Sequence, residues 1–286
     1  MFTDTTFVPG RYEREWLHSS LSEFFETGLL TDILFAVRGG KEASVYCCRA
    51  GPSAGGRLLA AKVYRPRKYR NLRNDATYRV GRQILDHSGK AMRANNQRLH
   101  RAVRNRTRVG KRMRHTSWLM HEYRTMRKLH GSGGDLPAPV DAGANVILMQ
   151  FIGDLDGAAP TLNRARIEPS GADRLLAEVL GNVETLLRHG LVHADLSPYN
   201  LMYHQDRCWL IDFPQAVDVY DNPNAQRLLE RDVARVWKWF RKRGATASCW
   251  EDLVDDIWDR VFGSDDGVPL VAISDPPPPS PIYRPE

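Results

Sequence analysis

Apolar residues near the start of the chain follow first a helical period and then a strand-like pattern. Between residues 11 and 26 they recur near three- and four-residue spacing, which predicts an amphipathic helix packed on the body of the protein. Three apolar runs follow at 33–37, 44–48 and 58–64, separated by glycine-rich turns. Because short apolar runs between such turns are typical of strands, they predict an antiparallel sheet.

The periodic pattern stops between residues 65 and 115, where we expect weakly amphipathic or mobile structure. A helix over 118–129, ended by glycine and serine, and a nearly unbroken apolar strand over 144–152 come next. The second half is mainly helical. Its expected elements are helices at 175–187, 228–240 and 250–261 and strands at 201–203 and 208–211.

The charge of the chain is concentrated in the stretch without periodicity. The 286 residues carry a formal net charge of +7, but residues 65–114 alone contribute +15 and the rest of the chain −8. A basic block on an otherwise acidic protein is typical of a surface that meets phosphates, such as RNA or a ribosomal subunit. A solvated or mobile charged segment explains the same block equally well.

Cysteine content and hydropathy indicate the compartment. The four cysteines form no CxxC pair, which argues against a zinc knuckle or a disulfide framework and favours a reducing environment. No stretch approaches the roughly 18 apolar residues of a membrane span, and the N-terminus has no signal-peptide pattern. We therefore expect a cytoplasmic protein without a membrane partner.

A cluster of polar residues in an apolar setting is the strongest indication of chemistry. His193 to Asn200 contains Asp195, and Asp212 follows at the end of a predicted strand. Asn200 and Asp212 offer the oxygen ligands that suit Mg²⁺ bound with a nucleotide. Asp195 is then free to orient an attacking hydroxyl. The spacing HxDxxxxN followed by Ile-Asp-Phe predicts phosphoryl transfer, although one Asp at a strand end is more often a cap.

Two charges of the first half fit the same chemistry. Lys62 lies inside an apolar strand, and Glu122 lies on the core-facing side of the helix predicted over 118–129. Because an unpaired buried charge is costly, we expect the two to form an ion pair that directs the ammonium at phosphates. The alternative is that they are unrelated surface charges.

The turn at residues 39–46 precedes the lysine strand. Backbone amides there, including those of Ser44 and Val45, together with Lys41 would cradle phosphates. A Gly-Gly-Lys sequence in a hairpin is by itself most often only a turn, so its position before Lys62 supplies the argument.

These residues resemble the RIO atypical protein kinases from about residue 34 to residue 237. The segments that carry the resemblance are Gly40 to Tyr46, Ala61 to Tyr64, Trp118 to Glu122, Val146 to Gly153, His193 to Asn200, Ile211 to Gln215 and Arg231 to Val233. The segments 193–197 and 211–215 resemble different branches of the family, so no branch is assigned.

The resemblance implies an α+β fold of the trimmed, two-lobed protein-kinase-like type, with an N-terminal antiparallel sheet plus helix and a mostly helical C-terminal lobe. It implies Met149 as gatekeeper, adenine held by the backbone at Gln150 and Ile152, and use of ATP and Mg²⁺. The expected segments are a helical extension at 1–32, an N-terminal lobe at 33–150 with a basic insertion at 65–115, a C-terminal lobe at 151–265 and a disordered proline-rich tail at 266–286.

The function that the resemblance implies is a serine/threonine protein kinase that phosphorylates a protein substrate or itself, or hydrolyses ATP. Two alternatives stay open at this point. One is a small-molecule kinase similar to aminoglycoside or choline phosphotransferases, which share HxDxxxxN. The other is an RNA- or ribosome-binding module with a nucleotide switch, for which the basic segment 65–114 is the evidence.

Overall fold

The computed structural model describes residues 5–40, 43–65, 84–86, 90–92, 97–105 and 107–263. Lys41, the tail predicted at 266–286 and much of the basic segment lie outside these residues. No helix in the described ranges is long and apolar enough to cross a membrane.

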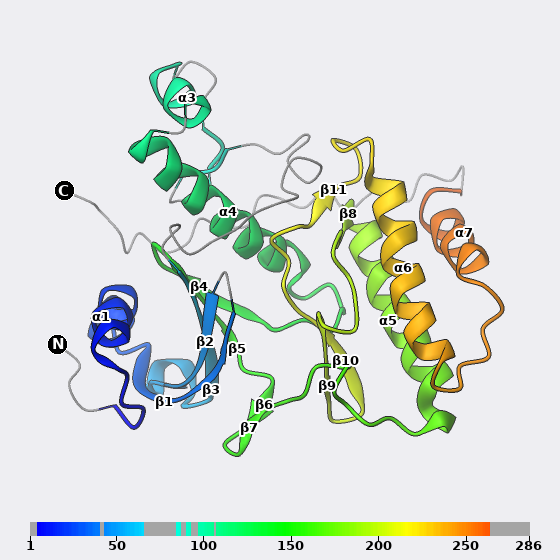
Figure 1. The fold of residues 1–286 in the computed structure, drawn as a ribbon, viewed down its shortest axis with the longest axis horizontal. Coiled ribbons are helices and arrows are strands. Elements are labelled where there is room, and N and C mark those ends of the chain that lie inside the picture. Colours follow the sequence, from blue (N-terminus) through cyan, green and yellow to red (C-terminus); the bar gives the residue numbers. More distant parts are fainter. Residues whose placement is uncertain are drawn as a thin grey trace.

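A five-stranded antiparallel sheet forms the N-terminal half of the structure (Figure 1). In spatial order it contains β1 (Leu30–Gly39), β2 (Ala43–Ala50), β3 (Leu58–Tyr64), β5 (Val146–Gln150) and β4 (Pro139–Ala142). The bounds of β3 agree with the sequence prediction, whereas β4 was not predicted. This strand begins at a proline and is short, and proline is tolerated there because β4 lies at the sheet edge.

Alternation along β3 places its side chains on two different faces of the sheet. Leu59, Ala61 and Val63 belong to a buried cluster on one face. Ala60, Lys62 and Tyr64 therefore point to the opposite face, because successive side chains of a strand alternate. The single lysine of this apolar strand is directed by the strand period toward the C-terminal half of the chain.

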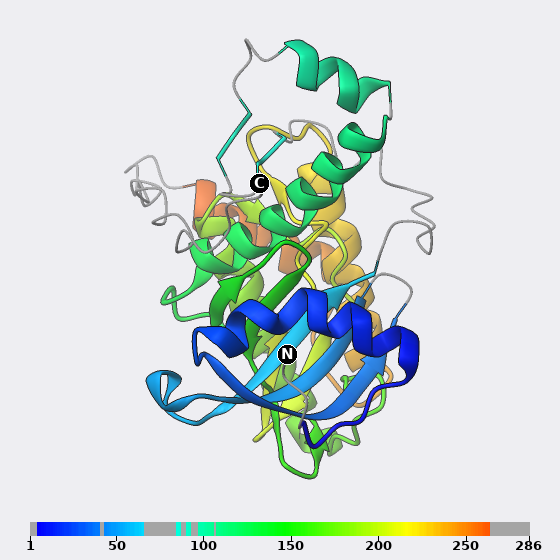
Figure 2. The same ribbon diagram turned by 90° about the vertical axis from the view of Figure 1, so that its left-hand side faces the viewer.

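Helix α1 (Arg11–Glu26) covers the first of these faces. Leu17, Leu21 and Phe24 of the helix are at most 1% exposed and pack against the sheet. Figure 2 shows α1 lying across the strands. The predicted amphipathic helix is thus confirmed, and it closes a core made of sheet and helix.

Helix α4 (Arg108–Leu129) lies on the other face. Trp118, Leu119 and Tyr123 pack with Tyr64 and Ile147 of the sheet. The helix begins ten residues before the predicted start, at an N-cap where Thr107 Oγ1 accepts from the Gly110 amide at 3.2 Å.

The first turns of α4 were not predicted because they are mostly polar and pack against another helix rather than against the core. This helix is α3 (Gln97–Arg104), and the two approach closely. A Cβ built at Gly110 would lie 1.9 Å from the Ala102 carbonyl oxygen, so only glycine fits at this contact.

The C-terminal half is built around three helices that pack side by side (Figure 1). They are α5 (Ala172–Arg188), α6 (Ala225–Arg241) and α7 (Trp250–Phe262). Two short sheets complete this half: β9 (Leu201–His204) with β10 (Arg207–Leu210), and β8 (Leu191–Val192) with β11 (Val217–Asp218). With a separate hydrophobic core in each half, the predicted α+β fold is confirmed.

The chain passes from the sheet to the helical half through a tight hairpin of β6 (Gly153–Asp154) and β7 (Gly157–Ala158). Gly153 has φ of 143°, and a Cβ there would lie 2.4 Å from the Gly157 carbonyl oxygen. Both the conformation and the close approach therefore require glycine at this position.

We predict that Gly153→Ala lowers the free energy of unfolding by roughly 1–3 kcal/mol, because the new methyl meets backbone and the conformation is strained. The matched control is Gly181→Ala inside α5, where nothing lies within 4 Å of the new Cβ. Alanine there should raise stability by about 0.5–1 kcal/mol. Urea unfolding of both variants measures this, and equal effects would contradict the prediction.

Candidate active site

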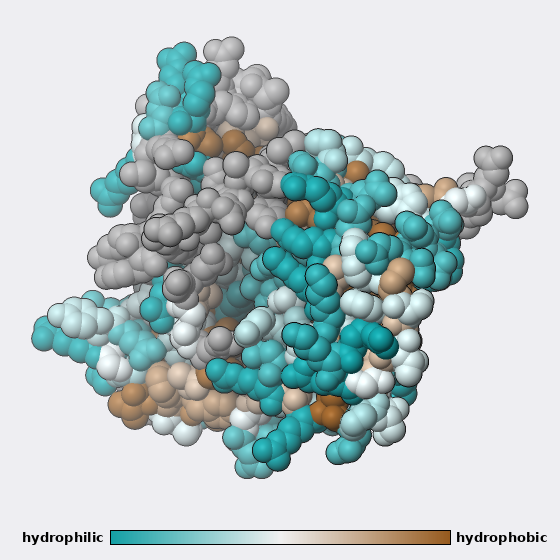
Figure 3. Space-filling model, turned by 45° about the vertical axis from the view of Figure 1, so that its right-hand side comes forward, coloured by the Kyte–Doolittle hydropathy of each residue, from teal (hydrophilic) through white to brown (hydrophobic). Residues whose placement is uncertain are grey.

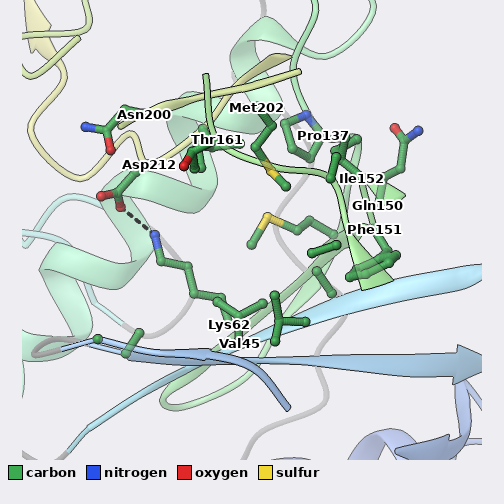
Figure 4. Close-up of a pocket in the computed structure, with 18 of the residues that line it drawn as sticks. Val45, Lys62, Pro137, Gln150, Phe151, Ile152, Thr161, Asn200, Met202 and Asp212 are labelled. Carbon is green, nitrogen blue, oxygen red and sulfur yellow. Dashed lines mark hydrogen bonds and ion pairs between the residues drawn. The ribbon is translucent and has the colours of Figure 1, made fainter. Parts of the chain in front are cut away.

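A cavity of about 670 Å³ lies between the sheet and the C-terminal half. Strands β3 and β5 supply one side, and residues before β9 and after β10 supply the other (Figure 4). Most residues predicted for the site line this cavity. They are Val45, Lys62, Glu122, Met149, Gln150, Ile152, Asn200 and Asp212.

Lys62 joins three separate segments of the chain. Its Nζ is 2.7 Å from Glu122 Oε1 on α4 and 2.6 Å from Asp212 Oδ1 after β10, the contact dashed in Figure 4. Tyr64, on the same face of β3, donates its hydroxyl proton to Glu122 Oε2. The predicted pair of Lys62 and Glu122 is confirmed, whereas the direct contact with Asp212 was not predicted.

Burial and charge compete over the protonation of this network. Burial favours a lower pKa for Lys62, but the charges of Asp212 and Glu122 outweigh it and hold the pKa well above its usual value. For Glu122 burial is the larger effect and raises the pKa despite Lys62. Burial also works to raise the pKa of Asp212, but the Lys62 ammonium brings it below the usual value. Lys62 therefore stays protonated, and its ammonium faces the cavity.

The residues beside Asp212 hold it in an unusual conformation. Asp212 has φ of 72°, a left-handed value that L-residues rarely adopt. His193, which is 2% exposed, has its Nε2 3.1 Å from the Ile211 carbonyl oxygen. Its ring also packs against Phe213, with 5.1 Å between centroids. Contacts on both sides of Asp212 thus aim its carboxylate at the cavity.

Asn200 and Asp212 form a small set of oxygen donors. Nδ2 of Asn200 donates to the Asp195 carbonyl oxygen at 2.8 Å, and Figure 4 shows the amide oxygen turned toward Asp212. Among the described residues no three His, Cys, Asp or Glu side chains gather as a metal site. A carboxylate and an amide nevertheless fit Mg²⁺, which takes few protein ligands and completes its shell with water and phosphate oxygens.

Asp195 lies at the edge of the cavity rather than in its lining. Its side chain is 46% exposed. Oδ2 is 3.4 Å from Asn200 Nδ2, and Oδ1 is 3.4 Å from Arg235 Nη1 on α6. The carboxylate is therefore open to a molecule that arrives from solvent.

Helix α6 holds the backbone on both sides of Asp195. Arg231 donates to the carbonyl oxygen of Ala194, whose φ of 61° is again left-handed. The carboxylate of Asp232, which is 1% exposed, accepts from the Leu196 backbone N–H. Arg231 and Asp232 were predicted only as part of the resemblance. The available signal was an acidic residue inside the apolar stripe of this helix.

The far end of the cavity is apolar. Val45 and Ala60 of the sheet and Met149 and Met202 line it, with Ile152 beside them. The backbone N–H of Ile152 has no hydrogen-bond partner in the part of the chain that the structure describes. This arrangement fits a flat aromatic ring that needs one hydrogen-bond donor.

One residue of the predicted phosphate loop, Ser44, lies apart from the cavity. Ser44 does not line it, and the Ser44 hydroxyl accepts from Arg65 Nη2 at 3.0 Å. Strand alternation explains this position, because Val45 faces the cavity and its neighbour must face away. Lys41 lies outside the described residues, so its predicted role stays a prediction.

Comparison with known proteins identifies a family. A sequence model of the RIO domain matches residues 60–253, about two thirds of the chain. The RIO-type serine/threonine-protein kinase Rio1 of Haloferax volcanii is 34% identical over 150 residues, which are 52% of this chain and 49% of that protein. Rio1 of Thermoplasma acidophilum is 34% identical over 127 residues, which are 44% of this chain and 65% of that protein. Human RIO1 is 26% identical over 240 residues, which are 84% of this chain and 38% of that protein. The matches thus span less than two thirds of each relative.

We predict that Asp232 makes folding stability fall as pH rises through neutrality. Burial raises its pKa to about 7, well above the value of about 3.9 in an unfolded chain. Between pH 6 and 8 the folded carboxyl loses a proton that the unfolded one has already lost, which removes about 1 kcal/mol of stability. Urea unfolding at both pH values measures the loss.

The matched variant for this prediction is Asp232→Asn, which stays neutral and still has an oxygen for the Leu196 N–H. The loss between pH 6 and 8 should be about 1 kcal/mol smaller in the variant than in the wild type. The same pH dependence in both proteins would show that Asp232 does not titrate in this range.

Proposed function

The chain belongs to the RIO domain family, and on this basis we propose that it is an ATP-dependent serine/threonine-protein kinase. One observation carries the proposal: Lys62 bonds both Glu122 and Asp212 in the cavity, with Asn200 in its lining and Asp195 at its edge. Kinases use a lysine and glutamate pair together with a metal-binding aspartate for phosphoryl transfer. The relatives named above are protein kinases, so a small-molecule kinase is not favoured.

A nucleotide would lie along the cavity from its apolar end to its charged end. The adenine would lie between Val45, Met149 and Met202, with the Ile152 N–H as hydrogen-bond donor. The triphosphate would then extend to Lys62, whose ammonium neutralises phosphate oxygens while Glu122 holds it in place. Asn200 and Asp212 would hold Mg²⁺, which supplies further positive charge to the phosphates.

Transfer itself needs an acceptor hydroxyl at Asp195. The carboxylate accepts a hydrogen bond from a serine or threonine hydroxyl and orients its oxygen toward the γ-phosphorus. A bond forms between that oxygen and the γ-phosphorus while the bond to the bridging β,γ-oxygen breaks, and ADP leaves. The hydroxyl proton passes to Asp195 and then to solvent.

We predict that Asp212→Asn and Asp195→Asn separate two roles. The Asp212 variant should lose Mg²⁺-dependent turnover, because an amide replaces the metal-binding carboxylate. The Asp195 variant should slow transfer by about 10²–10⁴-fold and bind ATP nearly as the wild type does. Transfer from γ-labelled ATP, with mass analysis of every product, measures turnover, and calorimetry measures ATP binding. Normal turnover in either variant would refute the role assigned to it.

A second candidate function, contact with RNA, is favoured by the helical hairpin of α3 and α4. Arg101, Arg104 and Arg108 are exposed there, and the sequence from 87 to 121 contains no acidic residue. Figure 2 shows α3 projecting away from the sheet and the C-terminal helices. A projecting cationic element of this kind fits a phosphate backbone.

We predict that the affinity for single-stranded RNA falls steeply with salt, with a slope of about −0.7 for each phosphate contact. Changing Arg101, Arg104 and Arg108 together to Gln should flatten the slope by about two. Fluorescence anisotropy with labelled RNA between 50 and 200 mM salt tests this. An affinity that ignores salt, or that survives the triple change, would exclude binding through this hairpin.

A further inference from the structure

We propose that Arg164 and Arg235 select an acidic polypeptide as the phosphoryl acceptor. The inference rests on the proposed kinase activity and assigns a substrate class to the same site. The two arginines come from different elements, the segment after β7 and helix α6, and neither was identified from the sequence. Figure 3 shows mainly hydrophilic side chains over the C-terminal half of one face.

Arg235 lies directly beside the carboxylate that receives the acceptor hydroxyl. Its Nη1 is 3.4 Å from Asp195 Oδ1, and the two side chains are 44% and 46% exposed. This distance exceeds the 2.7–2.9 Å of a tight charge-assisted hydrogen bond. A guanidinium has five N–H donors, so most remain available to an incoming anion. An acceptor that reaches Asp195 must therefore meet this cation.

Arg164 is held at the mouth of the cavity by the backbone around it. The Asn163 amide donates to the Pro198 carbonyl oxygen at 3.0 Å, which brings Arg164 close to Tyr199. Both side chains are exposed and line the cavity, and Tyr199 is only four residues beyond Asp195. The arginine therefore lies near the path of the acceptor.

The charge of Arg164 is not used within the part of the protein that the structure describes. Its side chain makes no ion pair or hydrogen bond with any residue that the structure describes. The carboxylates that line the cavity, Glu122 and Asp212, are both bonded to Lys62. Because Lys62, together with a metal held by Asn200 and Asp212, would neutralise the nucleotide phosphates, a further cation at the mouth is available to the acceptor.

Carboxylates next to the acceptor serine are the groups that these two arginines fit. The planar guanidinium binds a carboxylate through two parallel hydrogen bonds, and two such cations favour an acidic segment over a neutral or basic one. Only the hydroxyl of that segment reacts: its oxygen bonds to the γ-phosphorus and ADP departs. The flanking carboxylates contribute affinity and orientation.

The test compares two serine peptides, one with aspartates on both sides of the serine and a twin with asparagines. The wild type should phosphorylate the acidic peptide with kcat/KM about tenfold above its twin. Arg164→Gln and Arg235→Gln should each reduce this ratio by about three- to fivefold, the effect of one partly exposed ion pair. The KM for ATP in Arg164→Gln should match that of the wild type.

Arg166→Gln and Arg227→Gln are the matched controls. Each removes one exposed arginine from the same two elements, away from the cavity lining and from Asp195. Both should keep the wild-type ratio. Raising salt to 0.5 M should lower the ratio in the wild type and change it little in the doubly substituted Arg164→Gln, Arg235→Gln protein.

Several outcomes would overturn the proposal. The first is the same kcat/KM for both peptides in the wild type. The second is a fall in kcat/KM that is equal for both peptides in the variants. The third is a higher KM for ATP as the main effect of Arg164→Gln. Competition by RNA that also disappears in the two variants would instead assign these arginines to nucleic acid.

A binding measurement separates this failure from failure of the kinase proposal. Fluorescence polarisation with the same labelled peptides needs no turnover. Tighter binding of the acidic peptide, lost in Arg164→Gln and Arg235→Gln, without transfer to any acceptor would refute the kinase activity and keep the acidic-segment selection. Transfer that ignores peptide charge would refute only the selection.

Discussion

The contact of one lysine with two carboxylates is the constraint on which the site depends. Lys62 is 12% exposed and Glu122 only 1%, so removing either partner would leave a charge with little water. The first contact joins the sheet to α4, which also packs there through apolar side chains, and the second joins Asp212 of the C-terminal half to the same ammonium. A single cation thereby fixes three elements that are far apart in sequence.

The two ends of the site differ in how they are built. The end proposed for the nucleotide is enclosed by apolar side chains and by the paired charges around Lys62, so its shape is set by packing. The end proposed for the acceptor, at Asp195, is half-exposed, and α6 positions it through Arg231 and Asp232 rather than through a core. The enclosed end is therefore defined by packing, whereas the open end is defined by exposed charges.

Two of the four non-glycine residues with positive φ in the described chain lie where the chemistry is proposed, and the other two, Gln205 and Asp206, form the turn between β9 and β10. Ala194 and Asp212 both adopt left-handed conformations, and each is held by hydrogen bonds of its neighbours. Such conformations cost about 1–3 kcal/mol each and persist only when the surroundings determine them. The hydrogen bonds from Arg231 and Asp232 of α6, together with the buried His193, supply those surroundings. The helical core of the C-terminal half thus contributes to the site mainly by holding two short loops.

Strand period and helical spacing were enough to predict β3 and helix α1, because both patterns act over short distances. The partnership of Lys62 with Glu122 joins residues 60 positions apart and was predicted from the cost of burying an unpaired charge. The grouping of Asn200 with Asp212 was predicted from motif spacing. Local sequence was not enough for β4 or for the early start of α4, since these depend on sheet pairing and on a neighbouring helix. The positions of Arg164 near Tyr199 and of Arg235 beside Asp195 could not be predicted from the sequence. An exposed arginine shows its neighbours only after tertiary packing has placed other segments next to it.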